Sequence, residues 1–349
     1  MRSSYSEDDV ILLLKDITGQ VQPQPAEERE KLIQSGRHYC EMLPVEYVPT
    51  AKYMEIYERS LRIFAQDVAD AVGRLSEKII RQRGTNVVLV SLARAGIPIG
   101  ILVKRYIKYR FGTDVMHYSI SIIRGRGIDR TAMKYLLERY SPDKLLFVDG
   151  WTGKGAIANQ LSEAMREYDE VSPEIAAAAD PANITELCGT HDDILIPSSC
   201  LNSTVSGLIS RTFLRDDIIG KNDFHGAVYY GELADSDISY SFINEIEKKF
   251  RTSLPEDAVR PALQGIDEVK RIAREFGIDD INLVKPGIGE TTRVLLRRVP
   301  YRILVREQII DSEAAAPVLQ LAREKNVPVA VYPLENYCCC GIIKKMADT

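Results

Sequence analysis

Residues 145–157 read LLFVDGWTGKGAI, and this stretch decides the fold class. Four apolar residues run into Asp149, and glycines follow at positions 150, 153 and 155. A short apolar run before a glycine-rich loop is typical of a buried strand that is followed by a helix. Backbone N–H groups at the start of such a helix hold a phosphate well, and glycine allows its close approach. The stretch therefore predicts a strand, an anion-binding loop and a helix from Ala156.

The same order of strand, loop and helix is found on both sides of this stretch. NVVLVSLA (86–93) and DVMHYSISII (114–123) predict strands, and the loops RAGIPIG (94–100) and RGRGID (124–129) follow them. EIAAAAD (174–180) predicts a further strand. Strands that alternate with helices indicate an α/β fold with a mostly parallel sheet flanked by helices. In such sheets, ligands bind at the loops that leave the carboxyl ends of the strands.

The chain divides into three predicted parts. Residues 1–245 form the α/β domain, with an irregular extension over 1–50, and residues 246–280 form a charged linker with one helix. Residues 281–349 repeat a smaller α/β pattern and hold ten Lys and Arg against seven Asp and Glu, a net charge of +3. The rest of the chain has 35 basic and 43 acidic residues, a net charge of −8. This asymmetry predicts a polyanionic partner for the C-terminal part.

Composition narrows the class of protein. The 349 residues are 45% hydrophobic, and no apolar run is long enough to cross a bilayer, so we expect no membrane partner. The net charge of −5 excludes general nucleic-acid binding by the whole chain. The six cysteines follow neither a disulfide nor a zinc spacing, which predicts a reducing cytoplasm and no metal held by side chains. The oligomeric state stays open, with a homodimer as one option.

The three glycine-rich loops together resemble those of type I phosphoribosyltransferases, whose fold the resemblance implies for the larger domain. It implies that Asp149 holds the ribose of phosphoribosyl pyrophosphate (PRPP), and that Arg124 and Arg126 neutralise the departing pyrophosphate. The residues that it assigns to PRPP, with Mg²⁺, are Arg94, Ala95, Gly96, Thr152, Gly153, Lys154, Gly155 and Ala156. The implied activity is Mg²⁺- and PRPP-dependent phosphoribosyl transfer to a base, nucleotide or RNA. Gly150 stands where that family has a second acid, which keeps a non-catalytic PRPP sensor open.

A wider resemblance covers nearly the whole chain. GRHYCEMLPVEY (36–47), FVDGWTGKG (147–155) and SCLNSTVSGLISRTF (199–213) resemble a bacterial family of phosphoribosyltransferase-like proteins from tellurite-resistance and stress gene clusters. Its members also carry the label StiP cysteine protease. The resemblance implies a C-terminal Pelota-type RNA-binding domain over 281–349. Three residues of KPGIGETTRVLLRR (285–298) match an RNA-binding signature, namely Gly287, Glu290 and Arg293.

The protease label supplies a further hypothesis, cysteine proteolysis. In this chemistry, a thiol nucleophile needs a base beside it. Cys40 comes two residues after His38, and Cys188 comes three residues before His191. Nearness in sequence does not establish a catalytic geometry. Cys200 lies in a segment rich in Ser, Thr and Asn. We therefore keep cysteine proteolysis as an alternative, and this alternative predicts that Cys200→Ala abolishes activity.

Overall fold

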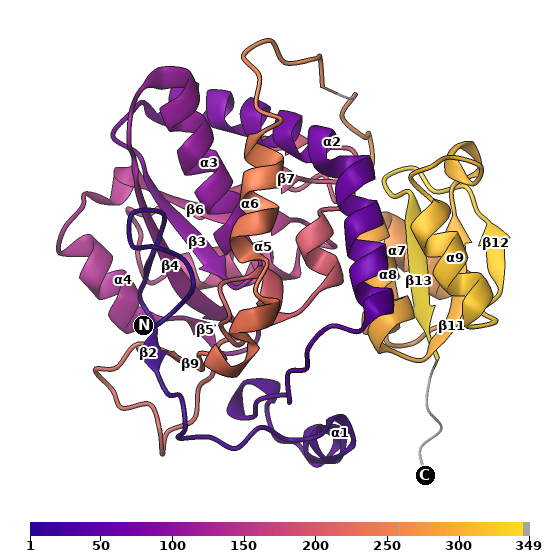
Figure 1. Ribbon diagram of the computed structural model, residues 1–349, viewed down its shortest axis with the longest axis horizontal. Coiled ribbons are helices and arrows are strands. Elements are labelled where there is room, and N and C mark those ends of the chain that lie inside the picture. The colour runs from indigo at the N-terminus through magenta and orange to yellow at the C-terminus, as the bar shows by residue number, and fades with distance from the viewer. Residues whose placement is uncertain (258, 345–349) are drawn as a thin grey trace.

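The computed structural model describes residues 1–257 and 259–344, in which the two main sheets each have their own helices (Figure 1). The larger sheet has the strand order β1-β4-β3-β6-β7-β8, with the short β5 beside β4. Every pairing along it is parallel except that of β4 with β5. The strands are β1 (Ile11–Leu12), β3 (Val88–Ala93), β4 (Met116–Ile123), β5 (Gly127–Ile128), β6 (Leu145–Trp151), β7 (Ile175–Ala179) and β8 (Cys188–Thr190).

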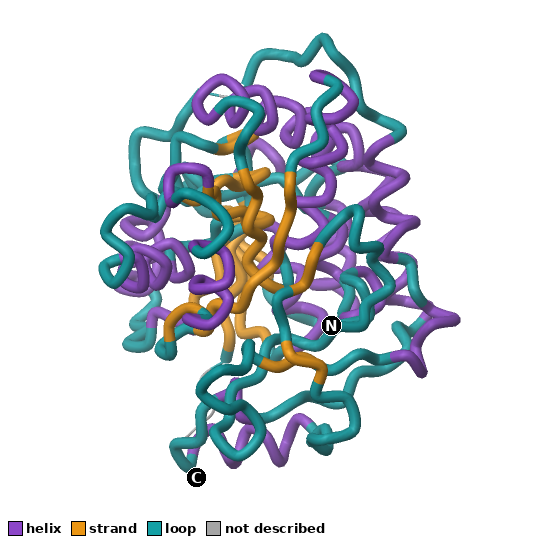
Figure 2. Tube along the Cα trace, turned by 90° about the vertical axis from the view of Figure 1, so that its left-hand side faces the viewer, coloured by secondary structure: helices purple, strands orange, loops and turns teal. Residues whose placement is uncertain are grey.

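Helices cover both faces of the larger sheet, so that its strands form a central layer (Figure 2). One face is covered by α2 (Ala51–Arg83), α3 (Gly96–Phe111) and α6 (Ser239–Glu247). The other face is covered by α4 (Arg130–Leu137) and α5 (Ala156–Met165). The predicted class, a mostly parallel sheet flanked by helices, is confirmed.

Local signals in the sequence set the ends of these helices. The Thr50 hydroxyl accepts the Tyr53 N–H at 3.5 Å where α2 begins, and Gly84 ends this helix with a φ of +70°. The Asp129 carboxylate accepts the Ala132 N–H at 2.9 Å at the start of α4. These residues fix where α2 begins and ends and where α4 begins.

Residues 1–50, predicted to be irregular, contribute small elements to the larger unit. β1 extends its sheet, and β2 (Lys15–Asp16) pairs in parallel with β9 (Gly226–Ala227). Helix α1 (Ala26–Gln34) and a 3₁₀ turn over Tyr39–Glu41 follow. Strands of two residues are too short to show an alternating pattern, so the sequence gives no sign of them.

The C-terminal unit is built on the smaller sheet, with the order β10-β13-β11-β12. Its strands are β10 (Val284–Pro286), β11 (Pro300–Val305), β12 (Val329–Val331) and β13 (Cys339–Ile343), and its helices are α7 (Gly265–Glu275), α8 (Ile288–Arg297) and α9 (Ala316–Glu324). Val269 and Ile272 of α7 are buried in the core of this unit. The helix of the predicted linker therefore packs with the C-terminal sheet.

Long helix α2 lies against the C-terminal unit (Figure 1). The Tyr53 hydroxyl donates to the Leu296 carbonyl at 2.6 Å, and Arg59 donates to Gln320 at 2.7 Å. Among the described residues, no helix has both the length and the apolar character needed to cross a bilayer.

Candidate active site

The glycine-rich loop after β6 contacts the C-terminal unit. The Tyr337 hydroxyl donates to the Gly153 carbonyl at 2.7 Å. The Lys154 ammonium donates to the carbonyls of Ile281 at 2.6 Å and Val284 at 3.3 Å, and burial lowers its pKa to about 8. The Gly153 carbonyl and the Lys154 ammonium of the predicted phosphate loop thus form hydrogen bonds with the C-terminal unit.

Other residues of the predicted PRPP site have local structural contacts. Asp149 accepts the N–H of Gly150 at 2.7 Å, and burial raises the pKa of Asp149 to about 7. A Cβ on Gly96 would lie 2.4 Å from the Val148 carbonyl oxygen, so glycine is needed here for α3 to approach β6. Ala95 precedes the first residue of α3, Gly155 has a φ of +88° before α5, and Ala156 begins α5.

The three arginines predicted to bind pyrophosphate also form hydrogen bonds or ion pairs with other residues of the protein. Arg94 donates to the Ile209 carbonyl at 3.0 Å and lies 3.6 Å from the Glu46 carboxylate. Arg126 forms an ion pair with Glu41 at 2.9 Å. The Arg124 guanidinium donates to Asn282 of the C-terminal unit at 3.1 Å.

The predicted RNA-binding residues lie just before α8 and in its first two turns. Gly287 precedes this helix with a φ of +93°. Arg293 donates to Glu290 at 2.9 Å, an ion pair between residues three apart on one helix. The Asp193 carboxylate accepts the Ile288 N–H at 2.9 Å and the Cys338 N–H at 2.7 Å, so it fixes this helix start against the larger unit.

A thiol and an imidazole are in contact at the 3₁₀ turn that follows α1. The Sγ atom of Cys40 lies 2.9 Å from Nδ1 of His38. Nε2 of His38 lies 3.1 Å from the main-chain carbonyl of Arg124, which only accepts hydrogen bonds. Nε2 therefore carries the ring proton. The lone pair of Nδ1 faces the Cys40 thiol and also accepts the Cys40 N–H at 3.4 Å. Cys40 is buried, while His38 is partly exposed.

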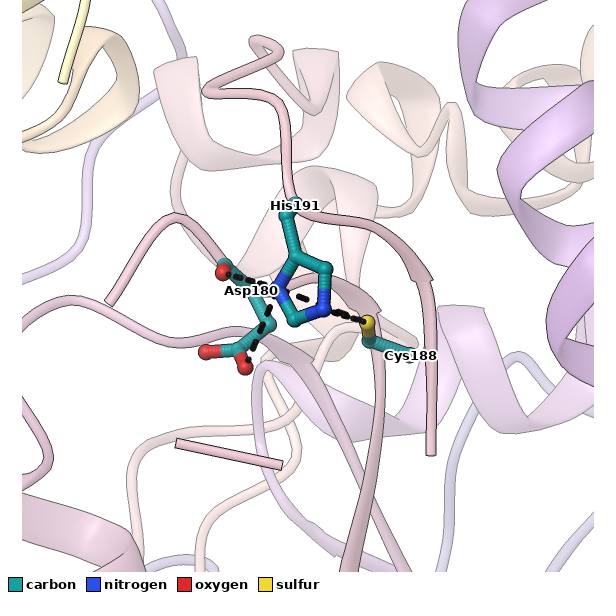
Figure 3. A group of neighbouring side chains, drawn as sticks. All are labelled: Asp180, Cys188 and His191. Atoms are coloured by element: carbon teal, nitrogen blue, oxygen red, sulfur yellow. Dashed lines mark hydrogen bonds and ion pairs between the residues drawn. The ribbon is translucent and has the colours of Figure 1, made fainter. Parts of the chain in front are cut away.

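A second thiol and imidazole, Cys188 and His191, meet beside β8 together with Asp180 (Figure 3). The Cys188 Sγ atom lies 3.5 Å from Nε2 and 3.8 Å from Nδ1 of His191. Nδ1 also lies 3.1 Å from the main-chain carbonyl of Asp180 and 3.6 Å from its carboxylate. Because the sulfur is almost equally far from both ring nitrogens, it lies in line with neither lone pair. This pair is therefore poorly arranged for proton transfer.

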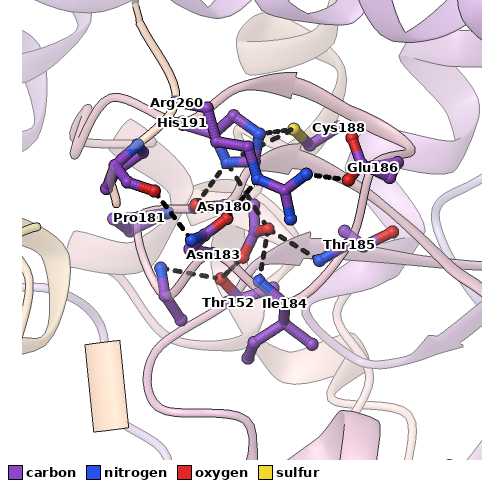
Figure 4. Close-up of polar contacts among 12 residues, drawn as sticks. Thr152, Asp180, Pro181, Asn183, Ile184, Thr185, Glu186, Cys188, His191 and Arg260 are labelled. Carbon is purple, nitrogen blue, oxygen red and sulfur yellow. Dashed lines mark hydrogen bonds and ion pairs between the residues drawn. The ribbon is translucent and has the colours of Figure 1, made fainter. Parts of the chain in front are cut away.

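Asp180 is the residue of this group that the sequence did not single out. Its carboxylate accepts hydrogen bonds from the Thr152 hydroxyl and from the N–H groups of Ile184 (2.7 Å) and Thr185 (2.8 Å), so it orders the loop after β7 (Figure 4). Burial raises the pKa of Asp180, and these three donors act against that rise. The available signal was the position of Asp180 at the end of the apolar strand EIAAAAD, which matches that of Asp149.

Cys200 is buried, and the bond found for its sulfur is to the Ser60 hydroxyl at 3.9 Å. Within residues 1–257 and 259–344, no histidine lies within hydrogen-bonding distance of this thiol. The structure thus gives Cys200 no neighbouring base, while it brings together the two pairs that are also close in sequence.

Comparison with known proteins gives matches along nearly the whole chain. The family model described as tellurite-like stress resistance cysteine protease StiP matches residues 3–247, and that of the PELOTA RNA binding domain matches residues 263–345. Cysteine protease StiP of Acinetobacter baylyi (strain ATCC 33305 / BD413 / ADP1) is 36% identical over 366 aligned positions, which cover 98% of this chain and 94% of the relative.

A solved hypoxanthine-guanine phosphoribosyltransferase from Bacillus anthracis str. 'Ames Ancestor' is 13% identical, over 41% of this chain and 75% of that one. Its TM-score of 0.25 is too low to support any argument. The prediction of PRPP-dependent phosphoribosyl transfer is wrong, because the family and the full-length relative are described as a cysteine protease. Mg²⁺ is predicted only as the ion that accompanies PRPP, so this prediction has no basis once PRPP transfer is excluded. The chain belongs to the StiP family of tellurite-like stress resistance proteins, with a C-terminal PELOTA RNA binding domain.

Proposed function

We propose that this protein hydrolyses peptide bonds, with Cys40 as the nucleophile and His38 as the general base. The observation that carries the proposal is the 2.9 Å contact between Cys40 Sγ and His38 Nδ1, with Nε2 held by the Arg124 carbonyl. A nucleophile, a base in contact with it and a third group that orients the base are what this chemistry requires. The name of the Acinetobacter baylyi relative supports the same class of reaction.

The reaction follows from these contacts. As Sγ of Cys40 attacks the carbonyl carbon of the substrate, Nδ1 of His38 takes the thiol proton. The C–N bond then breaks, and His38 returns the proton to the departing amine, which leaves a thioester on Cys40. His38 next removes a proton from water, whose oxygen attacks the thioester, and the carboxylic acid is released with the thiol restored.

The electrostatics favour a thiol that is activated during the reaction. Burial raises the pKa of Cys40 to about 11, and the nearby Arg126 and Arg211 act in the opposite direction. The resting group is therefore a neutral thiol, which depends on His38 to remove its proton. Because the thiol is buried, substrate access requires movement of the groups around the 3₁₀ turn.

The test uses the full-length protein and a library of peptides made from a digested proteome, with new N-termini identified by mass spectrometry. We expect wild type and Cys200→Ala to cleave peptides, and Cys40→Ala and His38→Asn to lose at least a hundredfold of the rate, because they lack the nucleophile or the base. Cys200→Ala is the matched control, since it removes another buried thiol.

Two results would overturn the proposal. If wild type generates no new N-termini, the protein is not a general peptidase. If Cys40→Ala retains full activity while Cys188→Ala loses it, the nucleophile belongs to the other pair.

We also propose that the C-terminal unit binds RNA. The description of its matching family and its net charge of +3 over 281–349 support this. Fluorescence anisotropy with a labelled, folded RNA tests it, and affinity should fall steeply as salt is raised because phosphate contacts dominate. We expect Arg293→Gln to weaken binding several-fold more than Lys15→Gln in the larger unit does. Equal effects would exclude the predicted position at the start of α8.

A further inference from the structure

We infer that Asp180, Cys188 and His191 form a binding site for a single divalent cation of the zinc type. The three side chains come from the end of β7, from β8 and from the residue that follows β8 (Figure 3). All three are buried, and their potential ligand atoms lie within 4.8 Å of one another.

The distances between these atoms suit a shared ion. Zinc binds sulfur at about 2.3 Å and nitrogen or oxygen at about 2.0–2.2 Å in a tetrahedron, so that two of its ligands lie about 3.3–3.6 Å apart. Nδ1 of His191 lies 3.6 Å from the Asp180 carboxylate and 3.8 Å from Cys188 Sγ. These separations are close to those of zinc ligands, although the sulfur is out of line for a hydrogen bond to the ring.

The donor set also fits the cation. A thiolate, an imidazole and a carboxylate are the side chains that bind zinc in proteins. On binding, the ion replaces the Cys188 thiol proton, which leaves to solvent. The His191 ring turns so that the lone pair of Nδ1 faces the ion, Nδ1 gives up its contact with the Asp180 carbonyl, and the ring proton moves to Nε2. Two negative ligands then balance the charge of the cation. The hydrogen bonds from Ile184 and Thr185 to Asp180 hold the carboxylate in place, as surrounding groups do in metal sites (Figure 4).

A cavity lined by His191, one of the three proposed ligands, lies beside the site and has space for a water molecule as fourth ligand. Its volume is about 150 Å³, and it is partly open to solvent. It is lined by His191, Asp192, Arg306, Glu335 and Asn336, and by Val259 and residues 261–263. Asn336 is only 2% exposed, and its Oδ1 atom has no hydrogen-bond partner among the described residues. An oxygen left unsatisfied beside this cavity is a suitable acceptor for a hydrogen bond from the bound water.

The inference is independent of the proposed peptidase chemistry, because that chemistry uses His38 and Cys40. It differs from the expectation of no metal, which was based on spacing alone. Cys188 and His191, which are close in sequence, supply only two ligands. The pairing of β7 with β8 brings Asp180 to them as the third.

The test begins with full-length protein that has been stripped with a chelator and dialysed. Zinc is added against a chromophoric chelator to obtain the affinity, and bound metal is counted by mass spectrometry. Cobalt is then added as a spectroscopic probe, because a cysteine ligand gives a thiolate-to-cobalt absorption band. We expect one zinc per chain for the wild type, together with this band.

One ligand variant and two control variants test the site. Cys188→Ser should lose the band and at least a hundredfold of the zinc affinity, while Cys200→Ser and Cys338→Ser should keep both. Circular dichroism shows whether each variant is folded. If Cys188→Ser does not fold, His191→Gln replaces it and should lose a comparable part of the affinity. A wild type that binds no stoichiometric zinc, or a folded Cys188→Ser that keeps the band, would overturn the inference.

Discussion

Two cysteine–histidine pairs in this chain contain the same groups and differ in geometry. In the 3₁₀ turn, His38 presents one nitrogen to Cys40 at 2.9 Å, and a main-chain carbonyl fixes the tautomer. Beside β8, the sulfur of Cys188 lies at similar distances from both nitrogens of His191, and a buried carboxylate completes the group. The first arrangement suits proton transfer, and the second suits ligation of one central ion. Geometry, and not residue type, separates the two roles.

The largest expected difference in stability between the two regions comes from their acids. Asp180 is fully buried with three donors, so Asp180→Asn should reduce the free energy of unfolding by about 2–4 kcal/mol. Glu41, beside the first pair, bonds to the exposed Arg126, so Glu41→Gln should cost under about 1 kcal/mol. Urea unfolding in the presence of a chelator measures both. Equal losses in the free energy of unfolding would mean that the contacts of Asp180 stabilise the protein no more than those of Glu41 do.

Thiol reactivity gives the next contrast. Burial raises the pKa of Cys40 to about 11 and that of Cys188 to about 12. The thiolate fraction grows about tenfold per pH unit below the pKa, so alkylation of Cys40 by iodoacetamide should rise about a hundredfold from pH 7 to 9. Cys188 should react more slowly at each pH. Site-resolved mass spectrometry follows both thiols, and a Cys40 rate that levels off below pH 8 would point to a resting thiolate.

A smaller effect concerns Asp149, which has one donor where Asp180 has three. Burial raises the pKa of Asp149 from 3.8 to about 7, so folding favours its protonated form. The stability from this group is present below the unfolded pKa and is lost as pH rises through the folded pKa. Between about pH 4 and 8, wild type should lose about 2 kcal/mol relative to Asp149→Asn, after allowance for partial exposure.

Unfolding of the two proteins across this pH range isolates the effect of Asp149, because they share every other titrating group. Parallel curves would show that the Asp149 carboxyl is solvated in the folded protein.

Much of the fold can be predicted from the sequence because its main elements are long and regularly patterned. Apolar residues from Met54 to Ile79 recur at helical spacing, and α2 covers them all. β3, β4 and β7 lie within the predicted strand segments, and β6 runs two residues past the predicted end at Asp149, through Gly150 and Trp151. β1 and β2 cannot be predicted from the sequence, because two residues are too few to show the alternation of a strand.

The site was harder to predict than the fold. The glycine-rich loops predict a phosphate site, yet the Gly153 carbonyl and the Lys154 ammonium bond to the C-terminal unit. The sequence does not show which surface covers a loop. His38 and Cys40 are close in sequence, but the orienting carbonyl of Arg124 lies 86 positions from His38. Asp180 reaches His191 through strand pairing. Contacts of this kind depend on the folded chain and leave no local pattern.

One residue, Arg124, touches both the thiol–imidazole pair and the C-terminal unit. Its carbonyl faces His38, and its guanidinium donates to Asn282. Thermodynamic linkage is reciprocal: a ligand on the C-terminal unit that displaces Asn282 changes the free energy of the orientation of His38, and a substrate at Cys40 changes the affinity for that ligand by the same factor. Such a ligand and a substrate at Cys40 would then act on the same conformational equilibrium.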